Sequence, residues 1–255
     1  MGKTHQHLLK FMLPDGVRLF PGDFRERLAK SEKLPPEFFN YDPETRQPAR
    51  QLSRKGFHKP TQMEQDSPDA LPSIRVVGGR SWVGILSKET HKDLLDRSVP
   101  VALDIVQGVC KKPVPVELSR YELGLEVSHF PRSYKIREMV IKKGTRKGMS
   151  EAEQFAIIKK RIEQSICRQA IDARLDCPVD EQMGVMVSSI DRPRGLRIIT
   201  ANGVTNQYAQ LVDVNFYAHL DLSGFWFAGN LTARGYGRII PWRQSLARGE
   251  EGGEE

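Results

Sequence analysis

A glycine-rich segment near the C-terminal end strongly restricts how this chain can fold. An apolar run at residues 224–229 leads into a loop. The loop contains three glycines: Gly229, Gly235 and Gly237. Three arginines lie in it or beside it: Arg234, Arg238 and Arg243. Glycine lets a ligand approach the backbone closely, and arginine forms forked contacts with phosphate. The segment is therefore either a hairpin with turn glycines or a phosphate-binding loop, although it matches no Walker loop or dinucleotide fingerprint.

The charge of the chain favours a polyanionic partner. Its 39 lysines and arginines exceed its 32 aspartates and glutamates, which gives a net charge of +7. Four of the glutamates lie within residues 249–255, so the rest of the chain is more basic still. Such a charge is typical of proteins that bind RNA, DNA or an acidic membrane surface. Because no apolar run approaches 18 residues, we expect no membrane role.

The cysteines and histidines do not form a recognisable metal site. The three cysteines, Cys110, Cys167 and Cys177, lack zinc-binding spacing, and their odd number argues for a reducing, cytoplasmic location. His5 and His7 alternate along a predicted strand, but no third ligand is near them in the sequence. We therefore expect no metal and no cofactor.

Strand and helix patterns occur in the order of an α+β protein. Strands are predicted at 5–13, on both sides of the Gly78-Gly79 turn in 73–86, and at 99–109, 114–127 and 207–227. Helical patterns occur at 22–31 and 88–96. Residues 183–200 are interpreted as a hairpin with its tip at 191–195.

These elements predict two ferredoxin-like (RRM-like) halves with an inserted basic α-helical finger. The first half covers 1–131 and includes a long basic loop at 41–73, which lacks apolar periodicity. The finger covers 132–174, and the second half, with the glycine-rich loop, covers 175–243. Residues 244–255 are interpreted as an acidic disordered tail.

The segment 132–174 has the strongest basic bias, with twelve basic residues against five acidic ones. Ser150 and Glu153 form a capping-box signature that predicts the start of a helix. The apolar residues of that helix recur at helical spacing and define one face: Phe155, Ile158, Ile162 and Ile166. Either the opposite face is only solvated, or it contacts a polyanion, which the preceding basic residues favour. The predicted RNA-binding residues of the segment are Arg132, Lys135, Arg137, Lys142, Lys143, Arg146, Lys147, Lys160, Arg161, Gln164 and Arg168.

Four segments, in this order, resemble one protein family. They are a strand and helix at 72–78 and 82–95, the basic region 135–162 with its Ser-Glu-x-Glu helix start, the segment 187–198, and the glycine-rich segment 229–242. The set is similar to CRISPR repeat-processing endoribonucleases of the RAMP superfamily, specifically the type I-F subgroup and its type IV relatives. The long basic loop at 41–73 favours the type IV crRNA-maturation enzymes.

The resemblance implies RNA cleavage without a metal, beside the stem-loop of a CRISPR repeat. A 2′-hydroxyl would attack the adjacent phosphate and leave a 2′,3′-cyclic phosphate and a 5′-hydroxyl. The product would stay bound, together with other subunits of a type IV-like effector complex. Two alternatives stay open: a non-catalytic crRNA-binding subunit, and a basic interaction module whose charge serves solubility.

The family's catalytic histidine has no counterpart here. The matching position falls near Leu28, beside Arg25 and Arg27. Arginine cannot act as a base at neutral pH, but it can stabilise a crowded phosphate. Ser189 matches the family's serine, although an ordinary strand serine is an equal alternative. The predicted catalytic residues are Arg25, Arg27, Ser189, Arg238 and Arg243, with His58 in reserve for the proton chemistry. The further predicted RNA-binding residues are Arg192, Arg194, Gly229, Arg234, Gly235 and Gly237.

Overall fold

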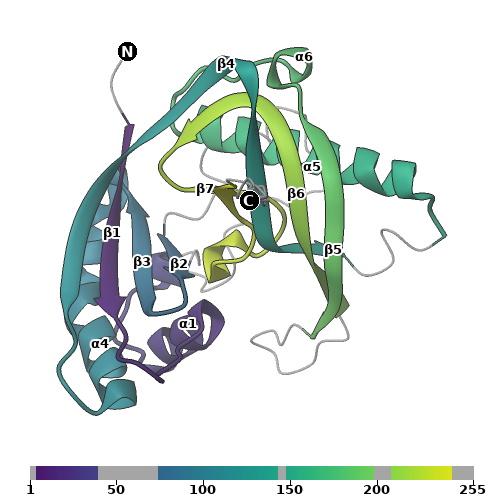
Figure 1. Ribbon diagram of the computed structural model, residues 1–255. Helices are drawn as coiled ribbons and strands as arrows, with labels where there is room; N and C mark the ends of the chain where they lie inside the picture. Colours follow the sequence, from purple (N-terminus) through teal and green to yellow (C-terminus); the bar gives the residue numbers. More distant parts are fainter. Residues whose placement is uncertain (1–3, 40–73, 143–147, 198–207, 243–255) are drawn as a thin grey trace, which may run out of the picture.

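The computed structural model describes residues 4–39, 74–142, 148–197 and 208–242 (Figure 1). The first half contains β1 (Thr4–Met12), α1 (Pro21–Lys30), η1 (Pro36–Phe39), β2 (Ile74–Gly78), β3 (Trp82–Lys88), η3 (Glu89–His91), α4 (Lys92–Cys110) and the start of β4 (Val116–Lys142). The second half contains the rest of β4, α5 (Glu151–Asp172), α6 (Asp180–Met183), β5 (Met186–Arg197), β6 (Tyr208–Ser223), β7 (Trp226–Phe227), η4 (Thr232–Arg234) and β8 (Arg238–Pro241).

Both halves have the strand order of a ferredoxin-like unit. In the first half the order is β2-β3-β1-β4, so the first strand lies between the third and the fourth. In the second half the order β5-β6-β4-β8 repeats this arrangement, with β4 now acting as the first strand. The long strand β4 joins the halves, because residues 116–123 pair with β1 and residues 124–142 pair with β6 (Figure 1). The predicted fold class is confirmed.

Each half has its own apolar core. In the first, Phe24 and Leu28 lie one turn apart on α1 and are fully buried, together with Phe11 of β1 and Leu95 and Val106 of α4. Burying each such side chain stabilises the fold by about 1.5–3 kcal/mol. The two helices therefore cover one face of the first sheet.

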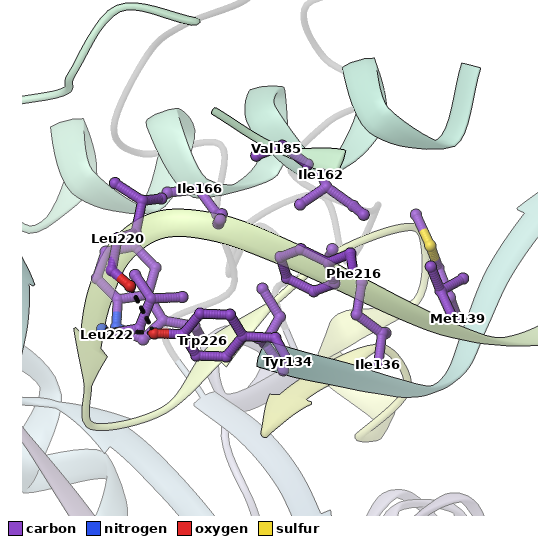
Figure 2. Packing of buried hydrophobic residues seen from close by; sticks show 14 of the residues in the cluster. Tyr134, Ile136, Met139, Ile162, Ile166, Val185, Phe216, Leu220, Leu222 and Trp226 are labelled. Atoms are coloured by element: carbon purple, nitrogen blue, oxygen red, sulfur yellow. Dashed lines mark hydrogen bonds between the residues drawn. The ribbon is translucent and has the colours of Figure 1, made fainter. Parts of the chain in front are cut away.

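In the second half, one long helix covers the sheet. Ile162 and Ile166 of α5 pack over Phe216 of β6 (Figure 2). The buried hydroxyl of Tyr134 donates a hydrogen bond to the Leu220 carbonyl oxygen at 2.8 Å and accepts one from the Leu222 N–H at 3.2 Å. These bonds satisfy a polar group that would otherwise destabilise the core.

Several sequence predictions are confirmed. They include the first strand, the first helix, and the two strands that flank the Gly78-Gly79 turn. The Ser150 side chain accepts a hydrogen bond from the Glu153 N–H, and the Glu153 carboxylate accepts one from the Ser150 N–H, so the capping box at the start of α5 is present. The loop 41–73 and the tail 244–255 lie outside the described residues.

The strand predicted at 99–109 is wrong, because these residues belong to helix α4. Their valines, leucines and isoleucines alternate in part, which suggested a strand. Buried residues in fact recur at helical spacing, as Leu95, Ser98, Ala102 and Val106 do. Packing against the sheet overrides the local preference of the β-branched residues and accommodates Pro100 inside the helix.

The boundary of the helical segment also needs correction. Residues 132–142 are the second part of strand β4, and the helix begins only after Ser150. The buried side chains of Tyr134 and Ile136 alternate with the more exposed Lys135 and Arg137, which is the period of a strand. The density of positive charge concealed this alternation.

The hairpin tip predicted at 191–195 is wrong too. Strand β5 runs through it, and a shift in register between Asp191 and Arg194 accommodates the proline and glycine of this stretch. A β-bulge of this kind keeps the strand paired where Pro193 cannot donate a backbone hydrogen bond.

Candidate nucleic-acid interface

The glycine-rich loop takes the place of a helix in the second half. Leu231 and Tyr236 of the loop pack with Val140, Ala209 and Leu211. The sequence neighbours of the latter three residues, such as Ile141 and Val212, lie in the core beneath α5. Because successive strand residues point to opposite faces, the loop covers the face of the sheet opposite α5.

The three glycines are required by the fold itself. Gly229, Gly235 and Gly237 all have positive φ angles, which other residues rarely adopt. A Cβ on Gly235 would lie 2.5 Å from the Val76 carbonyl oxygen, and one on Gly237 would overlap the Ala228 carbonyl oxygen. These contacts with protein atoms explain the glycines by chain packing, which agrees with the turn-glycine alternative of the two that the sequence left open.

Two buried glutamines hold the strand that leads into this loop. The Gln6 side chain of β1 donates to the Phe225 carbonyl oxygen at 3.1 Å and accepts from the Phe225 N–H at 2.8 Å. Gln169 of α5 bonds in the same two-sided way to Phe227, at 2.6 and 3.2 Å. The loop is therefore anchored to both halves of the molecule.

The first helix lies against the loop, as expected from the sequence. The Arg25 guanidinium donates to the Ala233 carbonyl oxygen at 3.4 Å and to the Phe39 carbonyl oxygen at 3.0 Å. It also lies 5.3 Å from the centre of the Phe39 ring. Arg25 is thus half-buried and fixed in position, while Arg27 is exposed two residues further along.

Tyr236 is a functional candidate that the sequence reasoning missed. Burial raises the pKa of its hydroxyl, Glu138 and Asp23 raise it further, and Arg234 and Arg194 act in the opposite direction. These charges come from α1, the loop, β4 and β5, so Tyr236 lies where the four segments meet. The signal in the sequence was a single tyrosine between Gly235 and Gly237.

Ser189 belongs to a polar group on the face of the second sheet opposite α5. Its hydroxyl donates to an Asp191 carboxylate oxygen at 2.8 Å and accepts from the Asn215 side-chain amide at 2.8 Å. On the neighbouring strands Asp213 accepts a hydrogen bond from the Glu138 N–H, and the Glu138 carboxylate pairs with Arg194 at 3.0 Å. Asp191 lies opposite Asp213 in the pairing of β5 with β6, so the two groups are neighbours, and Glu138 and Arg194 of the second group act on Tyr236.

Arg238 has a different environment from the loop arginines. Its guanidinium lies 4.4 Å from the ring centre of Phe225 and 5.8 Å from that of Trp82. Burial lowers its pKa, and the nearby Arg137 contributes to the shift, while Tyr121 opposes it.

Helix α5 presents several of the predicted RNA-binding residues. Lys160, Gln164 and Arg168 are exposed, and Arg161 is half-buried. Burial is the main cause that lowers the pKa of Arg161, and the charge of Arg168 adds to it. The two arginines, two turns apart, therefore lie close enough to repel each other, an arrangement that a bound anion would relieve.

The other predicted residues fall into two groups. On β4, Arg132 pairs with Asp221 at 3.3 Å, Lys135 is half-buried and Arg137 is exposed. The remainder lie outside the described part of the chain, either whole or by their side chains: Lys142, Lys143, Arg146, Lys147, Arg192, Arg243 and His58.

A carboxylate that is distant in the sequence, Glu89, lies beside His5 and His7 in the structure. One Glu89 oxygen lies 3.0 Å from His7 Nε2 and 3.9 Å from His5 Nδ1, and Arg120 pairs with the same oxygen at 3.3 Å. Strand β1 is central in the sheet, so these histidines are not at an edge. Within the described ranges, no three His, Cys, Asp or Glu side chains have an arrangement suited to a metal ion.

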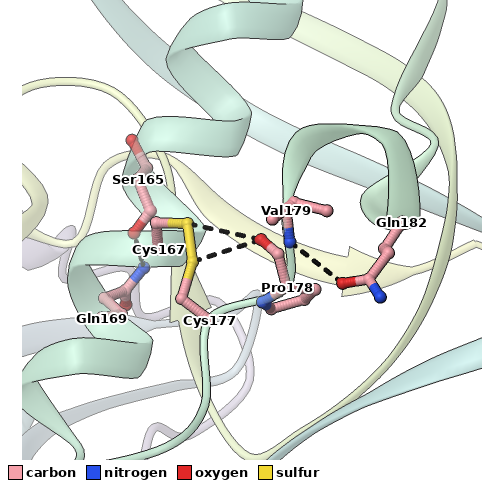
Figure 3. The surroundings of a disulfide bond; sticks show 7 residues. All are labelled: Ser165, Cys167, Gln169, Cys177, Pro178, Val179 and Gln182. Atoms are coloured by element: carbon pink, nitrogen blue, oxygen red, sulfur yellow. Dashed lines mark hydrogen bonds between the residues drawn. A yellow bond between two sulfur atoms is a disulfide. The ribbon is translucent and has the colours of Figure 1, made fainter.

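Two of the cysteines form a disulfide that the sequence reasoning did not predict. Cys167 of α5 is bonded to Cys177 in the segment that follows the helix, and Cys110 is buried and free (Figure 3). The bond closes a short loop beside the basic face of α5.

None of the helices in the described ranges has the length and apolar character of a membrane span.

Comparison with known proteins identifies the family. The family model described as the type IV CRISPR-associated endonuclease Csf5 matches residues 4–244. The chain belongs to the Csf5 family. A solved structure named as Csf5, the CRISPR-Cas type IV Cas6 crRNA endonuclease, is 42% identical and has a TM-score of 0.80, and the match covers 94% of this chain and 100% of that one.

More distant structures share the fold alone. A crystal structure of the CRISPR RNA processing endoribonuclease Cas6b is 12% identical with a TM-score of 0.57, and a second Cas6b structure is 10% identical with a TM-score of 0.51. Each match covers 93% of this chain and 100% of the other. A search of curated proteins gives no match. Membership of the Csf5 family confirms the resemblance found in the sequence.

Proposed function

We propose that the chain is a metal-independent endoribonuclease that cleaves CRISPR repeat RNA beside its stem-loop and keeps the product bound. The observation that supports this best is the meeting of Arg25, Arg234 and Tyr236 where α1 contacts the glycine-rich loop. The reaction needs a positioned 2′-hydroxyl, positive charge around the phosphate and a proton for the departing oxygen.

The arginines supply the positive charge. Arg25 is held by two backbone carbonyl oxygens, so little reorganisation is needed when charge develops on the phosphate. Arg234 follows on the neighbouring η4, where it and Arg27 both lower the pKa of Glu26 after the dominant effect of Lys30. We assign Arg25 and Arg234 to the phosphate and Arg27 to the outer rim of the site.

Tyr236 takes the part that histidine plays in the type I-F relatives. A tyrosine hydroxyl is protonated at neutral pH, and burial, which raises the pKa of Tyr236, keeps it in that form. A phenol is a stronger acid than the 5′-alcohol that leaves the phosphate, so it can supply the proton. Ser189 donates a hydrogen bond to Asp191 and keeps a free lone pair, with which it can orient the 2′-hydroxyl. As the 2′-oxygen bonds to the phosphorus, its proton can pass to Ser189 Oγ while the Ser189 proton passes to the Asp191 carboxylate.

The cations of α5 and β4, which are exposed or half-buried, bind the stem. Lys160, Arg161 and Arg168 on α5, with Arg137 on β4, would contact phosphates of the repeat stem. These contacts are the same in substrate and product, so product release is slow and turnover is close to single. A bound product of this kind suits a subunit of a type IV effector complex.

The test is cleavage of a repeat RNA followed on a denaturing gel, in EDTA and in magnesium. We expect equal cutting in both, 2′,3′-cyclic phosphate ends, and no cutting of RNA with a single 2′-deoxy nucleotide before the scissile phosphate. Cutting that requires magnesium would refute the mechanism. Tight binding without any cutting would favour the non-catalytic crRNA-binding subunit, and no RNA binding would favour a basic interaction module.

A further inference from the structure

A pocket of about 370 Å³ lies between the open face of the first sheet and the strands β7 and β8. Its lining includes the aromatic residues Trp82, Tyr121 and Phe225 and two cations, Lys10 and Arg238. Its volume lies in the range of pockets that hold small organic groups. None of its cations belongs to the group of residues around Tyr236.

The aromatic rings and the cations lie close together around the pocket. Lys10 Nζ lies 5.9 Å from the Trp82 ring centre, and the Arg238 guanidinium carbon lies 5.8 Å from the same ring. Tyr121 and Phe225 meet edge to face, 5.1 Å apart. Trp82 and Tyr121 are only partly buried, so ring surface remains accessible from the pocket.

The charged side chains that line the pocket are incompletely paired. Lys10 pairs with Glu117 at 3.2 Å. The Nε of Arg238 is buried, and no group in the described part of the chain accepts a hydrogen bond from it. A buried N–H without an acceptor is costly, since it has lost its hydrogen bond to water and gained none in exchange. A ligand with a hydrogen-bond acceptor and a flat face would satisfy both the arginine and the rings.

We propose that this pocket binds one unpaired nucleotide of the RNA, with its base stacked on Trp82 and its acceptor atoms facing Arg238. This proposal rests on the proposed function, which makes RNA the substrate. The bases of the stem are covered by their neighbours and expose no faces, so only a single-stranded nucleotide beside the stem can stack. Stacking on aromatic rings tolerates any base, while Arg238 adds a preference for bases rich in acceptors.

The experiment places 2-aminopurine at each unpaired position of a repeat RNA, one position at a time, and follows its fluorescence on binding. We expect strong quenching at one position only. An abasic site at that position should weaken binding about 5- to 150-fold, which is the range for one base–aromatic stack. RNA trimmed to the stem alone should bind no better than the abasic RNA.

Variants locate the contact. Trp82→Leu should remove the quenching and weaken binding of the flanked RNA, while leaving the stem-only RNA unchanged; Trp82→Phe should keep most of both. Phe130→Leu, which removes an exposed ring elsewhere on β4, is the matched control and should change nothing.

Two failures can be told apart. If the protein binds and cuts the hairpin but no unpaired position is quenched, or Trp82→Leu weakens both RNAs equally, the pocket proposal is wrong and the proposed function stands. If no hairpin RNA binds at all, the proposed function is wrong. The abasic arm uses the unaltered protein, so a folding defect in a variant cannot hide the result.

Discussion

The two halves have the same strand order but differ in their second crossover. In the first half the third and fourth strands are joined by α4, a helix of 19 residues. In the second half they are joined by β7, the glycine-rich loop and the three-residue η4. The first half thus has two helices on one face of its sheet, and the second has α5 on one face and a loop on the other.

This difference explains where the polar side chains gather. A helix like α4 contributes mainly an apolar face to the core, as Leu95, Ala102 and Val106 show. The loop instead carries Arg234 and Tyr236 to the junction with α1, where cations are held in fixed positions. On α5, Lys160 and Arg168 are exposed and can adjust to the RNA, and Arg161 beside them is half-buried. Held cations suit a transition state, whereas exposed cations suit grip.

The largest expected effect is on the cleavage rate and concerns Tyr236, in the glycine-rich loop of the second half. Tyr236→Phe should slow cleavage by about 10²–10⁴, the usual contribution of a positioned general acid, with little loss of affinity for the stem-loop. Single-turnover cleavage and equilibrium binding measure the two effects separately. Tyr217→Phe removes another half-buried hydroxyl of the second half and is the control. A Tyr236→Phe protein that cuts at the normal rate would move the proton transfer elsewhere.

The cleavage rate should be nearly as sensitive to Arg25, on helix α1 where it contacts the loop. Arg25→Ala should slow cleavage by about 10²–10³, the cost of one preorganised donor, while binding stays close to normal. Arg25→Lys should rescue little, because an ammonium group cannot reproduce the forked contacts. The control is Lys30→Ala on the same helix, which loses only a surface ion pair with Glu26. If Lys30→Ala lowered the rate as much as Arg25→Ala, the loss of rate would come from the lower positive charge of the helix and not from the position of Arg25.

Substitutions on α5 should show the opposite pattern, with a loss of RNA affinity and little change in cleavage rate. Arg161→Ala combined with Arg168→Ala should weaken binding and make the plot of log affinity against log salt shallower by about 1.4–1.8, since two phosphate contacts are lost. Cleavage at saturating protein should stay near normal. Lys92→Ala with Arg97→Ala removes two exposed cations from α4 and is the matched control. An unchanged salt slope would mean that the charged face of α5 is only solvated.

The smallest expected effect is on the stability of the folded protein and concerns Glu163, which is buried on α5. Burial raises the pKa of the Glu163 carboxyl, and the nearby Asp180 raises it further, while Lys159 opposes the shift. A carboxyl whose pKa is raised in the folded protein stabilises it only at low pH, and that stability is lost as the pH rises through the folded-state pKa. Glu163→Gln should therefore be more stable than the natural protein at neutral pH, and the difference should vanish in acid.

Thermal unfolding between acidic and neutral pH measures this effect. A gain of about 1 kcal/mol would raise Tm by roughly 2–4 °C for a chain of this length. Glu153→Gln, at the capping box of the same helix, is expected to lose stability instead, because hydrogen bonds to Ser150 lower the pKa of that carboxyl. Equal Tm values for Glu163→Gln and the natural protein at neutral pH would show that Lys159 fully compensates the buried charge.

Local pattern determined a large part of the fold and of the candidate site. Local pattern indicated the first helix, α1, and the start of α5 at Ser150 and Glu153. Arg25 was found through the resemblance to the family, which placed it beside the position of the missing histidine. Arg234 was recognisable because charge beside a glycine-rich loop is unusual. Such features depend on residues within a turn or two of each other, so the sequence contains the whole signal.

Long-range packing decided the rest. The segment around Val101 alternates like a strand, yet it forms a helix because its apolar face meets the first sheet. Pairing with β6 makes a strand of the basic stretch at Tyr134, where charge suggested a helix. Tyr236 acquires its raised pKa, and Arg238 its pocket, from residues more than 80 positions away, such as Glu138 and Trp82. No local pattern records such neighbours, because burial and pairing exist only once the two halves have folded together.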